Sequence, residues 1–248
     1  MNKTQNHRYT PVSHLQRHPR MGELTRDTKI GLMLFLHIPL AFLLRNVQLF
    51  ATLHAFVTLL IGAWIALTSD DLRKVVPVIA YITGAEVLWR MTEANILWEY
   101  GKYATVAILL IALLKHRKIK KAAFPVIYFI LLLPSAIITI NTLGLTSNTQ
   151  SAISFNLSGP LAAMMCMIYF RQIETDTSDL GSMMWWAIYP IMSLLTLATY
   201  STLTATAIDF GSESVFITSG GFGPNQVSAI LGLGAMLLIM LSIHEEKV

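Results

Sequence analysis

Long apolar runs constrain the fold of this chain more than any other feature of its sequence. Most of its 248 residues fall into predominantly apolar stretches of about 17–22 residues. Each stretch can cross a hydrocarbon core of about 30 Å as a helix that rises about 1.5 Å per residue. Only 13% of the residues are charged, against roughly 25% in an ordinary soluble domain. Because a spanning segment must satisfy its own backbone hydrogen bonds, these runs predict an all-α, polytopic transmembrane helix bundle.

Eight candidate spans can be placed along the chain. The first is short, and charged residues interrupt the pair between 75 and 114, so seven spans are an alternative. Residues 1–29 form a basic tail without the apolar core of a cleavable signal peptide, and residues 30–248 form the transmembrane helical domain. The eight ranges are 30–44, 49–67, 75–91, 97–114, 122–140, 152–170, 184–208 and 225–243.

The positive charges fall mostly on one side of the predicted membrane. With a cytoplasmic N-terminus and eight spans, fifteen of the eighteen Lys and Arg residues lie in cytoplasmic segments, as the positive-inside rule predicts. The run "KHRKIKK" at 115–121 is the strongest of these anchors, and only Arg45, Arg90 and Lys102 fall outside. The basic charge therefore indicates membrane orientation, and a nucleic-acid partner is not expected.

The segment "GAEVLWRMTEANILWEYGKY" at 84–103 carries charges at the predicted outer boundary. On a continuous helix, Glu86, Arg90 and Glu93 would project from one face, and Glu99 and Lys102 follow near the start of the next span. Charges at membrane depth normally face the interior of a bundle.

Two interpretations of this segment stay open. In the first, the charges neutralise one another and hold two helices together, while Lys102 extends toward the headgroups. In the second, Arg90 and Lys102, with Arg45, bind an anion that arrives from the outer leaflet, and Glu86 or Glu93 serves as a proton acceptor.

A second polar feature, "GGFGPNQVSAILGLG" at 220–234, precedes the last apolar run. Pro224 suits the first turn of a helix, and the glycines before it allow a sharp turn into the membrane. Asn225 and Gln226 then lie near free backbone N–H groups, which favour anions. Ser228 and Gly232 are four residues apart and predict an edge for close helix packing.

Other candidate sites have weaker signals. No histidine spacing resembles a metal motif and no nucleotide-binding pattern occurs, so neither a metal nor a cofactor is expected. His54 is interpreted as a helix contact. The acidic stretches at 68–71 and 174–179 could serve a metal-bound nucleotide sugar, but they are better explained as solvated loop acids that cap helix starts.

The two polar segments together resemble those of the O-antigen ligase and O-antigen polymerase family of bacterial membrane glycosyltransferases. The resemblance implies a multi-pass protein of the bacterial inner membrane. Such a protein transfers or polymerises glycan from an undecaprenyl-diphosphate carrier at the outer face, without a metal. It also implies membrane lipid, the lipid-linked glycan and polysaccharide-assembly proteins as partners.

The same resemblance assigns provisional roles. Stabilising a leaving diphosphate needs cations or helix N-termini, which Arg90, Lys102, Arg45 and the Asn225–Gln226 entrance match in kind. Family members are usually longer, with about a dozen spans, so this chain is expected to be an N-terminal portion. No Arg or His occurs between Ile208 and Asn225, where the family's essential residues would be sought.

Two other functions remain open at this stage. A transporter or flippase of lipid-linked sugars fits a multispan chain with intramembrane charges equally well. A truncated, non-catalytic partner in a polysaccharide assembly is the third interpretation.

Overall fold

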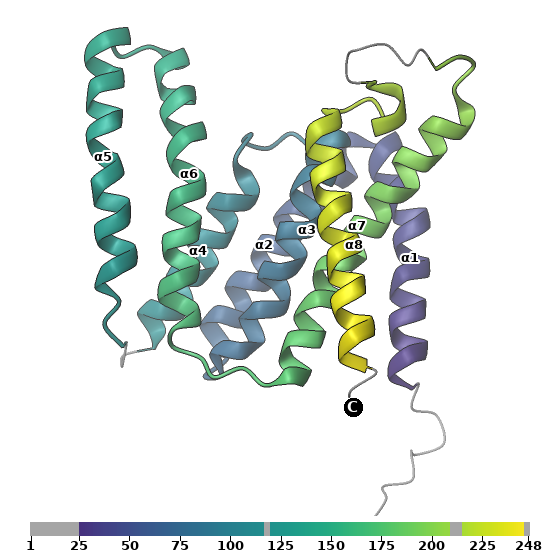
Figure 1. Ribbon diagram of the computed structural model, residues 1–248, viewed down its shortest axis with the longest axis horizontal. Coiled ribbons are helices and arrows are strands. Elements are labelled where there is room, and N and C mark those ends of the chain that lie inside the picture. The colour runs from purple at the N-terminus through teal and green to yellow at the C-terminus, as the bar shows by residue number, and fades with distance from the viewer. Residues whose placement is uncertain (1–24, 117–119, 209–214, 246–248) are drawn as a thin grey trace, which may run out of the picture.

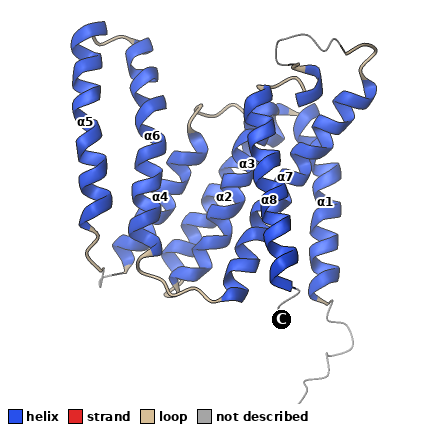
Figure 2. Ribbon diagram, in the orientation of Figure 1, coloured by secondary structure: helices blue, strands red, loops and turns tan. Residues whose placement is uncertain are grey.

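A computed structural model describes residues 25–116, 120–208 and 215–245. Most of the predicted basic tail, part of the "KHRKIKK" run and part of the connection before 215 lie outside the described residues. Every regular element in the described part of the chain is helical (Figures 1 and 2). The elements are α1 (Arg26–Asn46), α2 (Gln48–Thr68), η1 (Leu72–Val75), α3 (Val76–Met91), α4 (Tyr100–Lys115), α5 (Ala123–Leu143), α6 (Ser147–Phe170), α7 (Thr177–Thr204), η2 (Ile217–Ser219) and α8 (Pro224–Glu245).

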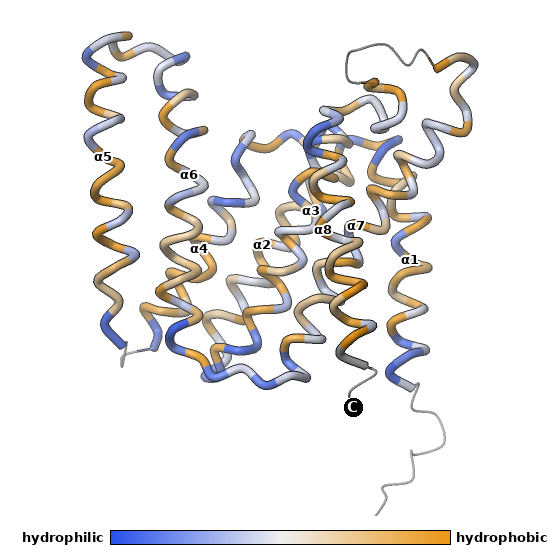
Figure 3. Tube along the Cα trace, in the orientation of Figure 1, coloured by the Kyte–Doolittle hydropathy of each residue, from blue (hydrophilic) through white to orange (hydrophobic). Residues whose placement is uncertain are grey.

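Each predicted span corresponds to one of the eight α-helices. Six of them, α1, α2, α5, α6, α7 and α8, are long and apolar enough to cross a membrane. The other two, α3 and α4, have 16 residues each, or about 24 Å of helix. Many large apolar side chains are exposed, among them Trp64 and Leu131. Hydrophobic residues also predominate along the helices (Figure 3). The described part of the chain is therefore an all-helical bundle, and the length and composition of its helices are those of a multi-pass membrane protein.

The helices run up and down in alternation, so their connections gather at two ends (Figure 1). The α1–α2, α3–α4 and α5–α6 connections, the end of α7 and the start of α8 lie at the end drawn uppermost (Figure 1), here called the upper end. The opposite end, which carries the start of α1 and the end of α8, is the lower end. All three outward cations of the sequence prediction therefore lie toward the upper end, because Arg45 closes α1, Arg90 closes α3 and Lys102 opens α4.

The short helix α3 lies at the centre of the bundle. Ala85, Leu88 and Trp89 are fully buried, and α3 packs closely on α7 at Gly84. A Cβ at Gly84 would collide with the Ala187 carbonyl of α7. At the edge, α5 packs against α6 and buries only Pro125. The α3–α7 contact therefore fixes the position of the Glu86–Arg90 face at the top of the core.

One packing prediction for α8 is wrong. Ser228 and Gly232 are exposed, and a Cβ at Gly232 would meet no atom within 4 Å. The buried positions are instead Val227, Ile230 and others at helical spacing. Gly234 marks the close approach, because a Cβ added there would lie 2.9 Å from Ile191 Cγ2. The apolar side chains of α8 set its orientation, and this turns the small-residue edge outward.

Candidate functional site

Arg90 joins the two polar segments at the upper end. Its Nη1 donates to the side-chain oxygen of Gln226 at 3.1 Å, and its Nε donates to the Trp98 carbonyl at 3.0 Å. A third contact is an ion pair with Glu86, one turn earlier on α3. The guanidinium also lies 4.8 Å from the centre of the Trp98 ring. The fold thus brings the α3–α4 hairpin and the α8 entrance, 136 residues apart, into direct contact.

Glu99 forms the buried part of the same cluster. Its side chain is 3% exposed, and Oε2 pairs with Lys102, accepts from Ser158 Oγ at 3.0 Å and lies 3.8 Å from Arg90 Nη2. The second carboxylate oxygen, Oε1, is buried without a hydrogen-bond partner among the described residues. We call Glu86, Arg90, Glu99 and Lys102 the ion cluster. Its two carboxylates balance its two cations.

Glu93 does not belong to the ion cluster, although helical spacing predicted it. The helix α3 ends at Met91, and Glu93 is exposed with a left-handed φ of 55°. The Ala94 N–H returns to the Trp89 carbonyl at 2.9 Å, which is the bonding pattern of a Schellman helix end. Because the backbone turns here, the Glu93 side chain leaves the Glu86–Arg90 face.

The glycine-rich loop connects Arg45 to this cluster. Arg45 Nη1 donates to the Gly220 carbonyl at 2.7 Å, and Gly220 and Gly221 have left-handed φ values of 71° and 82°. The Phe222 ring then lies 6.2 Å from the Trp98 ring. The helix α8 begins at Pro224, so the predicted sharp entrance is confirmed.

The candidate residues occupy different positions within the upper end. Gln226 contacts Arg90 directly, whereas Asn225 and Arg45 are exposed beside the cluster. The sequence prediction did not assign a role to Trp98 or recognise Glu99 as the buried carboxylate. The Glu99–Lys102 spacing of three at a helix start was the available signal for the latter.

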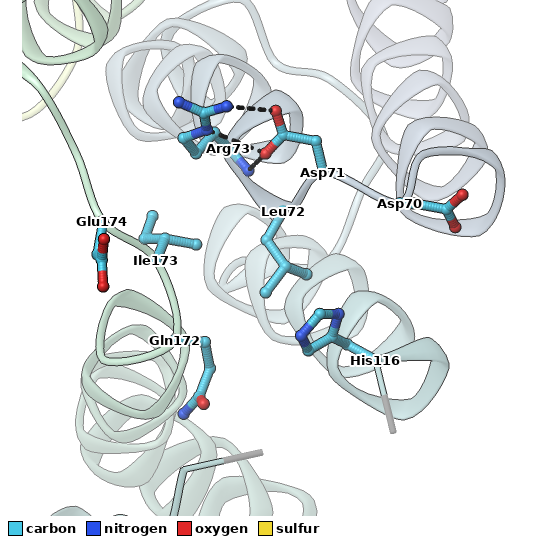
Figure 4. A pocket seen from close by; sticks show the side chains of 8 residues that line it. All are labelled: Asp70, Asp71, Leu72, Arg73, His116, Gln172, Ile173 and Glu174. Carbon is cyan, nitrogen blue, oxygen red and sulfur yellow. Dashed lines mark hydrogen bonds and ion pairs between the residues drawn. The ribbon is translucent and has the colours of Figure 1, made fainter. Parts of the chain in front are cut away.

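The lower end carries the acidic loops, which line a cavity of about 370 Å³ with His116 and Gln172 (Figure 4). Asp71 accepts from Arg73 Nε and Nη2 at 3.1 and 3.0 Å and also caps η1, while Asp176 caps α7. The hydrogen bond from Arg73 lowers the pKa of the Asp71 carboxyl. The helix-capping interpretation is therefore confirmed for Asp71 and Asp176. Within the described ranges, no group of three His, Cys, Asp or Glu side chains is arranged to hold a metal.

A chain of aromatic and imidazole groups crosses the middle of the bundle. Trp89 Nε1 donates to His54 Nδ1 at 2.8 Å, and His54 Nε2 lies 2.9 Å from the Tyr81 hydroxyl. That hydroxyl lies 3.2 Å from His37 Nε2, and His37 Nδ1 lies 2.7 Å from the Met33 carbonyl. His54 therefore joins α2 to α3, in agreement with the predicted helix contact.

Comparisons of the chain with family models, with curated proteins and with solved structures find no match.

Proposed function

We propose that this protein belongs to bacterial polysaccharide biosynthesis. In this proposal it resides in the inner membrane with the N-terminus in the cytoplasm and eight spans. It resembles the O-antigen ligases and polymerases and handles glycan on an undecaprenyl-diphosphate carrier at the upper, outward end. The observation that carries the proposal is the 3.1 Å hydrogen bond from Arg90 to Gln226. The two segments on which the family resemblance rests are distant in sequence but lie in direct contact.

The charge distribution supports the proposed orientation. Among the described residues, Arg45, Arg90 and Lys102 are the cations at the upper end, while Lys and Arg side chains such as Arg73, Lys74 and Lys115 lie at the lower end. Cytoplasmic segments carry this kind of excess. The upper end would therefore face away from the cytoplasm.

The proposed diphosphate site uses the edge of the ion cluster. Since Glu86 and Glu99 neutralise the cluster, attraction for an anion would come from Arg45 and from the start of α8. Arg45 adds one positive charge and is exposed. Arg90 would hold Gln226 and the α8 entrance in position, and Lys102, whose side chain is 29% exposed, would contact the carrier from α4.

Glycan length in cells tests the proposal. Arg90→Ala and Asn225→Ala should each abolish long-chain glycan while the protein still inserts normally, as judged by its membrane abundance. Glu174→Gln, on the lower-end loop, is the control that should leave glycan length unchanged. Unaltered glycan in both upper-end variants would refute the assignment.

A transporter or flippase of lipid-linked sugars is the second candidate, favoured by the polar chain from Trp89 to Met33 inside the bundle. The side on which unprocessed lipid-linked sugar accumulates in a deletion strain separates the two. A transferase leaves it at the outer face, and a flippase leaves it at the inner face. A non-catalytic partner of an assembly would instead require a second protein for any glycan transfer.

A further inference from the structure

A second cavity lies at the upper end, between the α3–α4 hairpin and the upper part of α6. Its volume is about 870 Å³, toward the upper end of the range of small-molecule sites. This cavity is separate from the proposed diphosphate contacts on Arg45 and α8. Its walls are formed by residues that include Trp98, Glu99, Tyr103, Ser154, Phe155 and Asn156.

The lining of this cavity is unusual for a membrane-spanning helix. The first part of α6 reads "SNTQSAISFNLSG", so uncharged hydroxyl and amide groups replace the apolar residues that a lipid contact would favour. Ser154 Oγ lies 2.6 Å from the Tyr103 hydroxyl across the α4–α6 contact. A face of this kind suits a ligand that has many hydroxyl groups of its own.

Two aromatic rings complete the cavity. Trp98 and Phe155 are 54% and 62% exposed, so both rings are accessible to a ligand in the cavity. Each ring is near a cation of the ion cluster, Trp98 beneath Arg90 at 4.8 Å and Phe155 near Lys102 at 6.0 Å. Aromatic rings beside hydroxyl and amide groups match both the C–H faces and the hydroxyl groups of a sugar.

The carboxylate of Glu99 has one oxygen that accepts no hydrogen bond. Glu99 contributes to the cavity wall, and its Oε1 atom is buried without a hydrogen-bond partner among the described residues. A buried carboxylate oxygen without a donor carries a desolvation cost of roughly 1–3 kcal/mol or more. A water or a ligand hydroxyl that reached this oxygen would supply the donor that it lacks.

We infer that this cavity is a saccharide-binding subsite for neutral sugar units. Trp98 and Phe155 would stack on the sugar, and Asn156 and Glu99 would bind its hydroxyl groups. The inference rests on the proposed function, to which it adds the place of the glycan beside the carrier diphosphate. Because Glu99 is paired with Lys102 and the ion cluster is neutral, the cavity offers a diphosphate or an acidic sugar no net attraction, and its polar wall disfavours an acyl chain.

The test is saturation-transfer NMR on the full chain in lipid nanodiscs. The probes are the methyl glycosides of glucose, galactose, mannose and N-acetylglucosamine. We expect saturation transfer to at least one glycoside. Phe155→Ala and Asn156→Ala should each lower the affinity for that glycoside about tenfold, or 1.4 kcal/mol. Both residues are exposed, so these variants should fold normally. Phe124→Ala, 76% exposed on α5, is the matched control and should bind as the unmodified protein does.

Glu99→Gln reports on the buried carboxylate and should weaken binding of the same glycoside. Absence of transfer to all four glycosides, or equal transfer in the Phe155 and Asn156 variants, would overturn the inference and leave the cavity to water or lipid. This outcome is distinct from failure of the proposed function. If glycan length depends on Arg90 but no glycoside binds, the proposed function stands and the subsite is rejected. If a glycoside binds but glycan is unaltered in the Arg90 and Asn225 variants, the subsite stands and the proposed function is rejected.

Discussion

The indole N–H of Trp89 donates to Nδ1 of His54 at 2.8 Å, and this single contact fixes the direction of a hydrogen-bond chain through the bundle. An indole nitrogen can only donate, so Nδ1 of His54 carries the lone pair and Nε2 carries the proton. At the far end the Met33 carbonyl can only accept, so Nδ1 of His37 carries a proton. The Tyr81 hydroxyl then accepts from His54 and donates to His37.

Loss of the Tyr81 hydroxyl should break this chain at its centre. We expect Tyr81→Phe to lower the free energy of unfolding by about 1–3 kcal/mol, because a half-buried donor on His54 and a buried acceptor on His37 lose their partner together. Unfolding of the purified protein in mixed micelles measures the change. Tyr128→Phe, on a 41% exposed side chain of α5, is the control. Equal stability of the two variants would contradict the directed chain, as would ¹⁵N NMR shifts that put the proton of neutral His54 on Nδ1.

The Arg90–Gln226 contact should appear as an energetic coupling between the hairpin and α8. In a double-mutant cycle, Arg90→Ala and Gln226→Ala should couple by about 1.5–3 kcal/mol, as expected for a hydrogen bond to a charged group. Asn225 is the neighbouring amide but is exposed, so the Arg90–Asn225 cycle should couple by less than about 0.5 kcal/mol. Similar coupling in the two cycles would mean that the side-chain contact does not join the segments.

The end of α3 shows where sequence periodicity stops being informative. Spacing alone puts Glu86, Arg90 and Glu93 on one face, and the first two are indeed paired. The helix ends at Met91 because Glu93 and Ala94 donate to the Arg90 and Trp89 carbonyls, with Glu93 in the left-handed position that is usually glycine. No glycine or proline marks this helix end in the sequence, so the turn could not be predicted from the residue types.

Glu93→Gly tests this account. Since glycine adopts a φ of 55° without the steric cost that Glu93 bears, we expect the free energy of unfolding to rise or stay level, by up to about 1 kcal/mol. Glycan length should be unaltered, because Glu93 lies away from the ion cluster. A variant that inserts normally but makes no long-chain glycan would restore Glu93 as a functional carboxylate.

The helices themselves were largely predictable, because each apolar run can satisfy its backbone only as a helix. The contacts between them were not. The Arg90–Gln226 bond joins positions 136 residues apart, and no local pattern specifies which helices meet. For the same reason the sequence suggested Ser228 and Gly232 as a packing edge, although the core is closed by Gly84 against Ala187 and by Gly234 against Ile191.

The stability of the folded protein at acidic pH should depend on Asp71. The hydrogen bond from Arg73 lowers the pKa of this carboxyl below its ordinary value of 3.8. The resulting stabilisation is present above pH 3.8 and is lost as the pH falls through the lower folded-state pKa. Asp71→Asn should therefore lower the Tm most at pH 6, and the difference should shrink below pH 3.8. In an Arg73→Gln background this pH dependence should largely vanish, and its persistence there would assign it to another group.

A glycine-to-alanine substitution should affect stability in opposite directions at Gly31, which lies on α1, and at Gly84, which lies in the α3–α7 contact. Alanine favours a helix interior over glycine by about 1 kcal/mol, so Gly31→Ala, with no atom within 4 Å of the new Cβ, should be neutral or stabilising. The same change at Gly84 drives a Cβ against the Ala187 carbonyl and to 2.9 Å from Pro190. Backbone atoms of α7 cannot move aside without shifting the helix, so we expect Gly84→Ala to destabilise by about 1–3 kcal/mol.

Because α3 also holds Glu86 and Arg90, Gly84→Ala should in addition shorten the glycan. A Gly84→Ala protein as stable as Gly31→Ala would mean that α3 and α7 are not in close contact, and the position of the ion cluster would then need another support.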